Sequence, residues 1–274
     1  MTQSSHDPSL DPVIEVHDLV VQYGDRVVLD GLSFTIPRGK IFVILGGSGS
    51  GKSTLLRNLV GLMRPTSGRI VIEGRDFAAM SDAERREVRK GMGMCFQGSA
   101  LFNSMTVAEN VSLPLLEHTQ LERSTIDIVA RMKLDLVGLS GTEDYLPAQL
   151  SGGMKKRAGL ARAMAMDPTI IFYDEPSAGL DPIAAAGLDD LIRRLQSTFN
   201  LTSIVVTHEM ESVRQIADQV LVLHKGQIAA LGSLDEVMAS DHPFVEQFFA
   251  RRPNPEDDGG PAYLRSLTGT RFQP

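Results

Sequence analysis

The feature that most constrains the fold is a run of glycines and hydroxyl residues between an apolar segment and a helical pattern. Residues 41–45 read Ile-Phe-Val-Ile-Leu, which is typical of a buried strand. Residues 46–54 continue as Gly-Gly-Ser-Gly-Ser-Gly-Lys-Ser-Thr, and a helical pattern begins at Thr54. Glycines let consecutive backbone amides curl around phosphate oxygens, and the start of a helix adds partial positive charge. The order of strand, loop and helix therefore predicts a P-loop that binds a nucleoside triphosphate.

The residue types in this loop predict separate roles. Lys52 is expected to reach the β- and γ-phosphates, and the hydroxyl of Ser53 is expected to bind Mg²⁺. The residues expected to hold the nucleotide here are Gly46, Gly47, Ser48, Gly49, Ser50, Gly51, Lys52, Ser53 and Thr54.

A second apolar strand ends in two carboxylates. Residues 169–173 read Thr-Ile-Ile-Phe-Tyr and are followed by Asp174 and Glu175. A parallel strand at this position delivers its last side chains to a ligand crevice. Asp174 suits Mg²⁺, and Glu175 is expected to polarise the attacking water as a general base. Together with the P-loop, this strand still allows many kinases and ATPases.

Composition narrows the class of protein. The apolar content of 42% supports a substantial core. The 27 basic residues against 34 acidic ones give a net charge of −7, so no broad basic surface indicates nucleic acid as a partner. The apolar runs are far shorter than the ~20 residues that span a bilayer, and the first residues do not resemble a secretory signal. We therefore expect a cytosolic chain, in which the single cysteine, Cys95, is a small buried hydrophobe.

Strand-like runs alternate with helical patterns from residue 13 to about 240, which predicts an α/β domain with a parallel sheet. The alternation of apolar and polar residues over 32–36 instead predicts a half-buried antiparallel strand. Residues 81–84 and 106–109 have the pattern of capping boxes, so helices are expected to begin at both places.

A serine and two glycines open a further helix in the sequence Leu150-Ser151-Gly152-Gly153. Such a helix start is itself an anion site. Here the chain resembles the ATP-binding cassette (ABC) ATPases, whose hallmark is Leu-Ser-Gly-Gly between the two nucleotide motifs. Met154 is a departure, because many members of the family carry glutamine there, and we expect little catalytic loss from it.

Four further matches stand in the order that the family shows. Gln97 resembles the family's Q-loop glutamine, and residues 177–181, which end at Asp181, resemble its D-loop. His208 resembles its switch histidine, and Tyr23 resembles the aromatic residue that stacks on adenine. The resemblance implies ATP and Mg²⁺ as cofactors, catalytic roles for Glu175, His208 and Gln97, and Mg²⁺ ligands at Ser53, Gln97 and Asp174.

The resemblance also implies a P-loop NTPase fold with an antiparallel β subdomain and an inserted helical subdomain. Two copies of the chain would sandwich two ATP molecules, with the P-loop of one copy facing the other copy. The residues of the facing copy would be Ser151, Gly152, Gly153 and Asp181. Hydrolysis would remove the bridging γ-phosphate contact and let the two halves part.

The domain organisation follows from the extent of these matches. We expect a flexible N-terminus over 1–12 and an ABC ATPase domain over 13–250, with the helical subdomain at about 98–165. Residues 253–261 are rich in proline, glycine and acidic residues, so 251–274 are expected to form a linker and a docking tail. Within the tail, 262–272 regains apolar residues at helical spacing and is expected to dock on a neighbouring subunit.

A more particular resemblance covers 96–119 and 150–157. These segments are similar to the ATPase subunits of the bacterial Mla phospholipid transporters, which serve MCE-domain proteins. This implies a permease dimer, a periplasmic MCE-domain ring, a small STAS-domain subunit and phospholipid cargo. The chain would then lie at the cytoplasmic face of the inner membrane, held there by its permease partners. Leu101, Phe102 and Leu113 would either fill the helical subdomain or face the permease.

Two other functions share these motifs. One is the ATPase of an importer for a polar solute such as an amino acid. The other is a soluble ABC ATPase that acts on ribosomes or DNA. Members of that second group usually carry two cassettes or long coiled-coil insertions, and this chain has neither.

Overall fold

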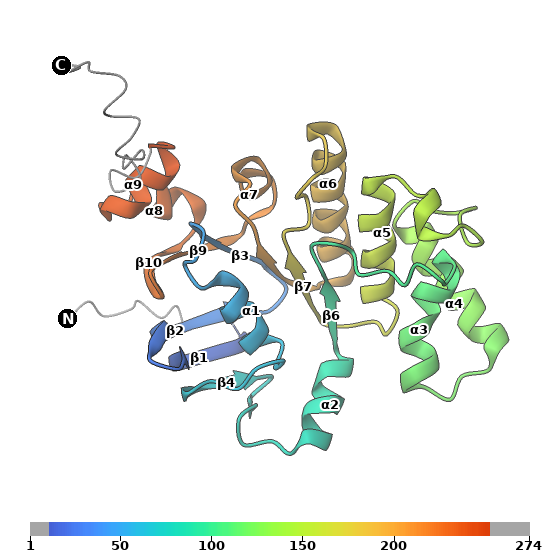
Figure 1. Ribbon diagram of the computed structural model, residues 1–274, viewed down its shortest axis with the longest axis horizontal. Helices are drawn as coiled ribbons and strands as arrows, with labels where there is room; N and C mark the ends of the chain where they lie inside the picture. Colours follow the sequence, from blue (N-terminus) through green and yellow to red (C-terminus); the bar gives the residue numbers. More distant parts are fainter. Residues whose placement is uncertain (1–10, 253–274) are drawn as a thin grey trace, which may run out of the picture.

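The computed structural model describes residues 11–252, and Figure 1 shows how their helices and strands are arranged. Residues 253–274 of the expected linker and docking tail, and residues 1–10 of the expected N-terminal segment, lie outside the described residues. Within 11–252, no helix is long and apolar enough to cross a membrane.

The first part of the chain forms an antiparallel sheet of four strands in the order β2-β1-β4-β5. The strand expected from the alternation over 32–36 is confirmed, since Leu32, Phe34 and Ile36 are buried in β2. The strand bounds are β1 Pro12–Tyr23, β2 Arg26–Pro37, β4 Ser67–Ile72 and β5 Arg75–Asp76.

The second sheet has six strands in the order β10-β9-β3-β8-β7-β6. The pairs β9·β3, β3·β8, β8·β7 and β7·β6 are parallel, and only β9·β10 is antiparallel. The predicted α/β architecture is therefore confirmed. The bounds are β3 Ile41–Gly46, β6 Met92–Cys95, β7 Ile170–Asp174, β8 Thr202–Val206, β9 Gln219–His224 and β10 Gln227–Gly232.

Both faces of the parallel sheet are covered, which explains why its strands are continuously apolar. Ile41, Val43 and Leu45 of β3 belong to one core cluster, while Phe42 and Ile44 belong to the other. Alternate side chains of one strand thus enter cores on opposite faces. Each fully buried side chain of this size contributes about 1.5–3 kcal/mol to folding.

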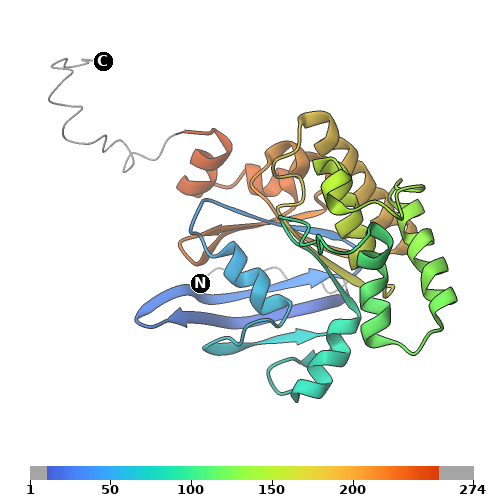
Figure 2. The ribbon, with the colours of Figure 1, turned by 45° about the vertical axis from the view of Figure 1, so that its right-hand side comes forward.

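The helices cover the sheet and extend it at one end. Figure 2 shows α1 lying over the antiparallel strands, and in both views α3 and α4 lie at the end opposite to α8 and α9. The helix bounds are α1 Lys52–Leu59, α2 Asp82–Lys90, α3 Val107–His118, α4 Arg123–Leu136, α5 Gly152–Ala163, α6 Pro182–Phe199, α7 Met210–Ile216, α8 Leu234–Met238 and α9 Pro243–Phe249, with a 3₁₀ turn at Pro147–Gln149.

Both predicted capping boxes are present. Ser81 and Glu84 exchange side-chain and backbone hydrogen bonds at the start of α2, and Thr106 and Glu109 do the same at α3. Each box satisfies two amides that the helix cannot satisfy itself. Helix α3 packs against α4 and α5, and this group of helices lies beside the end strand β6.

Candidate nucleotide site

Four neighbouring strands bring the candidate residues to one edge of the parallel sheet. The P-loop starts at Gly46, the last residue of β3, and His208 follows β8. Asp174 ends β7, and Gln97 lies just after β6. Because β3, β8, β7 and β6 are consecutive in the sheet and parallel, their carboxyl ends meet at the same edge.

The P-loop needs glycine where it leaves the strand and where it enters the helix. A Cβ added at Gly46 would lie 2.3 Å from the carbonyl oxygen of Leu223. At Gly51, where φ is 107°, an added Cβ would lie 2.6 Å from Cδ2 of Leu29. Gly51 is the N-cap of α1 and has no side chain to cap the helix, so the first amides of α1 are left to bind an anion.

Lys52 is folded back onto the loop. Its Nζ donates to the carbonyl oxygens of Gly46 at 2.8 Å and Gly47 at 3.0 Å. Burial lowers the pKa of Lys52, and the nearby carboxylates of Glu175 and Asp174 oppose that shift. The ammonium group is therefore held against the loop and lies near enough to the two carboxylates to interact with their charge.

A cavity of about 440 Å³ runs from the P-loop to Tyr23. Its lining consists of Tyr23, Arg26, Val28 and residues 49–54. The ring of Tyr23 is 45% exposed, and its hydroxyl donates to Sδ of Met63 at 3.1 Å. A fixed, exposed aromatic ring beside a phosphate-binding loop suits stacking on a nucleotide base.

The carboxylates at the end of β7 differ in their surroundings. Burial raises the pKa of Asp174, and the neighbouring charge of Glu175 raises it further against the cations Arg57, Lys156 and Lys52. No hydrogen bond within residues 11–252 engages the Asp174 carboxylate. Its oxygens are therefore available to a metal ion.

Glu175 is held at one oxygen and left free at the other. Its Oε1 lies 2.9 Å from Nδ1 of His208, while its Oε2 is buried and has no hydrogen-bond partner among the described residues. A buried carboxylate oxygen without a donor is costly unless a ligand or water supplies one. This arrangement suits a carboxylate that accepts a proton from a water molecule.

The residues expected to bind Mg²⁺ carry the right donor atoms for it. Mg²⁺ prefers oxygen ligands and is usually held by one or two carboxylates together with substrate phosphates. Ser53, Asp174 and Gln97 offer a hydroxyl, a carboxylate and an amide oxygen at the same sheet edge. No cluster of three or more His, Cys, Asp or Glu side chains suited to a metal occurs in the part of the chain that the structure describes. The donor set thus fits Mg²⁺ shared with phosphates.

The remaining candidate residues lie elsewhere in the chain. Ser151 is the N-cap of α5 and accepts from the amide of Met154, while Gly152 and Gly153 lie against the start of α6. Asp181 is the N-cap of α6 and accepts from two amides at 3.0 Å. Neither helix start lines the cavity at the P-loop, and α5 lies apart from α1 in Figure 1. Within one chain, the structure does not bring these residues to the P-loop.

Comparison with known proteins decides the family. The profile of the family described as ABC transporter matches residues 29–178, which include the P-loop, the Leu-Ser-Gly-Gly segment and the two carboxylates. The chain belongs to the ABC transporter family. The chain is accordingly an ATP-hydrolysing enzyme of the ABC type.

Among the relatives of this ABC ATPase is the intermembrane phospholipid transport system ATP-binding protein MlaF of Haemophilus influenzae. It is 44% identical over 86% of this chain and 89% of that protein. The probable ribonucleotide transport ATP-binding protein mkl of Mycobacterium tuberculosis is 42% identical over 87% of this chain and 67% of that protein. Among solved structures, the dimeric, post-hydrolysis ATP-binding cassette MJ0796 bound to ADP and Pi aligns with a TM-score of 0.74 and 28% identity, over 81% of this chain and 98% of that one.

Sequence reasoning missed two cations of α5 that contact the loops of the candidate site. Lys156 and Arg162 donate to backbone carbonyls after β6 and β7. In the sequence, Lys156 is only one member of a basic run, because its contacts depend on how α5 packs beside the sheet. The only indication in the sequence was that Lys156 is a basic residue about one helical turn after the Leu-Ser-Gly-Gly segment.

Proposed function

We propose that the chain is the ATP-binding and ATP-hydrolysing subunit of an inner-membrane complex that moves phospholipids between the inner and outer membranes. The observation that carries the catalytic part is the Glu175–His208 pair beside the P-loop, with one buried glutamate oxygen free. The family relationship and the MlaF relative support the transport part.

In this proposal each residue at the sheet edge has one task. Lys52 and the amides at the start of α1 bind the phosphates, and Tyr23 stacks on the adenine. Glu175 takes the proton of the attacking water, and His208 holds the glutamate at its other oxygen. Ser53, Asp174 and Gln97 would hold Mg²⁺, which when bound would neutralise charge on the phosphates.

The separation of Ser151 from the P-loop supports a dimer with two composite sites. The start of α5, with its free amides and serine, is an anion site that faces no phosphate site of its own chain. A second copy would bring its own Ser151, Gly152, Gly153 and Asp181 to this P-loop. The structural neighbour MJ0796, which is dimeric, supports that assembly.

A large groove supports docking of a membrane partner. It has a volume of about 870 Å³ and lies between α2, the strand β6 and α3. Phe102 and Leu113 line it, and Phe102 is 51% exposed, whereas Leu101 packs against the core. The three residues that were expected either to fill the helical subdomain or to face the permease therefore differ: Leu101 packs against the core, whereas Phe102 and Leu113 line the groove. We assign the groove to the permease.

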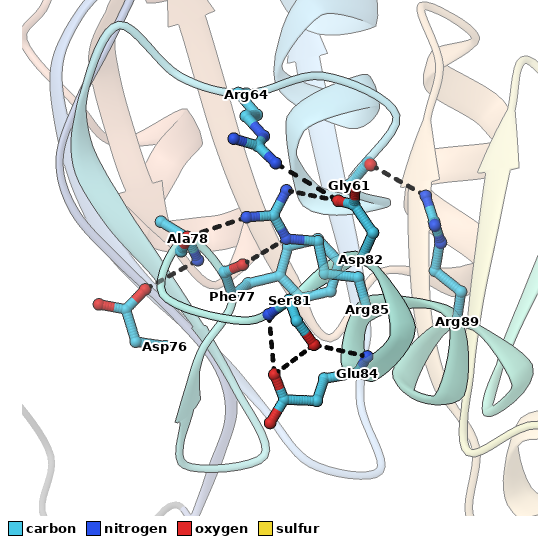
Figure 3. Close-up of polar contacts among 10 residues, drawn as sticks. All are labelled: Gly61, Arg64, Asp76, Phe77, Ala78, Ser81, Asp82, Glu84, Arg85 and Arg89. Carbon is cyan, nitrogen blue, oxygen red and sulfur yellow. Dashed lines mark hydrogen bonds and ion pairs between the residues drawn. The ribbon is translucent and has the colours of Figure 1, made fainter.

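Helix α2, one wall of this groove, is fastened to the nucleotide-binding part of the chain. Figure 3 shows Arg85, which is buried and donates to the carbonyl oxygens of Phe77 at 3.0 Å and Ala78 at 2.8 Å. Arg89 donates to the carbonyl oxygen of Gly61 at 3.2 Å, just beyond the end of α1. Because α1 starts at the P-loop, the Arg89 hydrogen bond connects the groove wall to the helix that leaves the phosphate site.

The cargo is the part of the proposal that depends on relatives. The MlaF relative is named for phospholipid transport and the mkl relative for ribonucleotide transport. The chain spans more of the length of the former, which favours phospholipid. A STAS-domain subunit and a periplasmic MCE-domain ring complete the proposed complex. The mkl relative keeps import of a polar solute as the second candidate function.

Affinity purification of the full chain from detergent-solubilised membranes tests the assembly. We expect an integral permease, an MCE-domain protein, a STAS-domain protein and bound phospholipid to accompany it. Phe102→Asp is expected to lose the permease, because it replaces an exposed aromatic contact of the groove with a smaller, strongly hydrated carboxylate. Phe199→Asp, at an exposed phenylalanine of α6, serves as the matched control and should keep it.

Other co-purified partners would contradict the proposal. A solute-binding protein without phospholipid would support the importer, and ribosomes or DNA would support the soluble ATPase. Retention of the permease by Phe102→Asp at the level of the parent would reject the groove as its docking surface.

A further inference from the structure

Lys156 of α5 connects two catalytic loops through their backbones. Its Nζ donates to the carbonyl oxygen of Gln97 at 2.6 Å and to that of Glu175 at 3.1 Å. We propose that Lys156 is a positioning residue that fixes the backbone of Glu175 relative to the Gln97 loop, so that α5 determines where the general base stands. This inference rests on the proposed ATPase function.

The two carbonyls lie where the sheet no longer holds the chain. Strands β6 and β7 pair in parallel up to Cys95 and Tyr173, which are partners in the register. Gln97 and Glu175 each follow two residues later, beyond the last ladder pair. Up to Cys95 and Tyr173, backbone hydrogen bonds of the sheet join the two strands. Beyond that point, Lys156 joins the two segments instead.

The backbone of Glu175 needs such a support. Its φ is 48°, in the left-handed region that is strained for a residue with a side chain. Its amide donates to the carbonyl oxygen of Val206 at 2.8 Å, and its carbonyl accepts from Lys156 and, at 3.3 Å, from the amide of Ala178. A charged donor at that carbonyl contributes more than a neutral one, so its loss would free the strained residue to turn.

The surroundings of Lys156 indicate that its charge serves to hold the two loops. Burial lowers the pKa of Lys156, which means that placing the ammonium there carries a cost. Glu175 and Asp174 lie near enough to oppose that shift, as does Cys95. The two carbonyl contacts together with this acidic surrounding compensate for the burial. Lys155, next along the helix, makes none of these contacts.

The rest of the Gln97 loop is also attached to α5. Arg162 donates to the carbonyl oxygens of Ser99 at 2.8 Å and Ala100 at 2.7 Å, two residues that also have positive φ. Gly159 approaches so closely that an added Cβ would lie 3.3 Å from Cβ of Ser99. The loop and α5 therefore form one unit, and Ser151 stands at the start of that same helix. A shift of α5 would reach the general base through Lys156.

The test compares Lys156→Met with Lys155→Met in the full chain. We expect Lys156→Met to lower kcat on the order of 10- to 100-fold, because displacing a catalytic group by about 1 Å has an effect of this size. Affinity for ATP should stay at the parental value, since Lys156 does not line the P-loop cavity. Lys155→Met should match the parent. Lys156→Arg, which keeps a charged donor, should recover most of the turnover, which a role in packing alone would not predict.

A second background separates action through Glu175 from a general effect. In Glu175→Gln, where the base is already absent, Lys156→Met should lower the remaining rate far less than it does in the parent. An equal reduction in both backgrounds would overturn the proposal, as would parental turnover in Lys156→Met. If Lys156→Met does not fold, as judged by its thermal unfolding, Lys156→Gln carries the same comparison.

Failure of this inference differs from failure of the proposed function. A parent chain that does not hydrolyse ATP, or a Glu175→Gln variant with parental turnover, would reject both. An active parent with a slow Glu175→Gln variant and an unaffected Lys156→Met variant would reject only the positioning role.

Discussion

Glu175→Gln is expected to bind ATP as the parent does while hydrolysing it roughly 10²- to 10⁴-fold more slowly, the range for loss of a general base. The amide keeps the shape of the side chain and a contact to His208, so the site should stay folded. It cannot take a proton from water at the position of the buried Oε2. The measurement is steady-state phosphate release together with equilibrium binding of ATP.

Glu211→Gln is the matched control for this experiment. Glu211 is an exposed carboxylate in the first turn of α7, after the same strand that precedes His208. The Glu211→Gln variant should hydrolyse ATP at the parental rate. Parental turnover in Glu175→Gln would remove Glu175 from the mechanism, and loss of ATP binding would show that the side chain has a structural role instead.

Ser151→Arg is expected to prevent the ATP-driven dimer. Ser151 caps α5 on a surface that meets no phosphate in its own chain. Loss of the cap weakens the monomer by about 1 kcal/mol, whereas the crowding of the larger side chain would be felt only in the sandwich. Overpacking of a closed interface costs about 1–3 kcal/mol. That corresponds to dimerisation weakened roughly 5- to 150-fold, since each 1.4 kcal/mol is a factor of about ten.

Sedimentation with ATP in the Glu175→Gln background measures this effect, because slow hydrolysis preserves the closed dimer. Ser197→Arg is the control, since Ser197 is exposed on α6 away from both helix starts. ATP binding by the monomer should be unchanged in both variants. Dimerisation of Ser151→Arg at the parental concentration would show that the composite site is wrong.

The parts of the fold that depend on local pattern could be predicted from the sequence. The apolar run before the P-loop is a buried parallel strand, and both capping boxes start helices, because each depends on residues only a few positions apart. The alternation over 32–36 likewise gives an antiparallel strand. The candidate loops and carboxylates of the site could be selected for the same reason.

The relations between those residues could not be predicted from spacing. The strand order that brings the loops of β3, β8, β7 and β6 to one edge depends on pairings across the whole chain. The contact of Glu175 with His208 joins residues 33 apart, and that of Lys156 with Gln97 joins residues 59 apart. The left-handed backbone of Glu175 is also set by its surroundings, since glutamate has no preference for it.

In the helical region, too, sequence pattern could not predict where single residues lie. Leu101 and Phe102 are adjacent and both apolar, yet Leu101 packs against the core and Phe102 lines the groove. Sequence pattern assigned neither position, because consecutive residues outside a regular element have no fixed period. The tail over 253–274 stays a prediction, and its docking on a partner remains to be tested by deletion.

Phospholipid transfer by the purified complex, reconstituted between two populations of vesicles, tests the central claim most directly. Labelled phospholipid should move only when ATP and Mg²⁺ are supplied, and the rate should fall with ATP hydrolysis when Glu175→Gln replaces the parent chain. A complex that hydrolyses ATP while phospholipid stays where it is, or whose hydrolysis responds to a polar solute instead, would contradict the account.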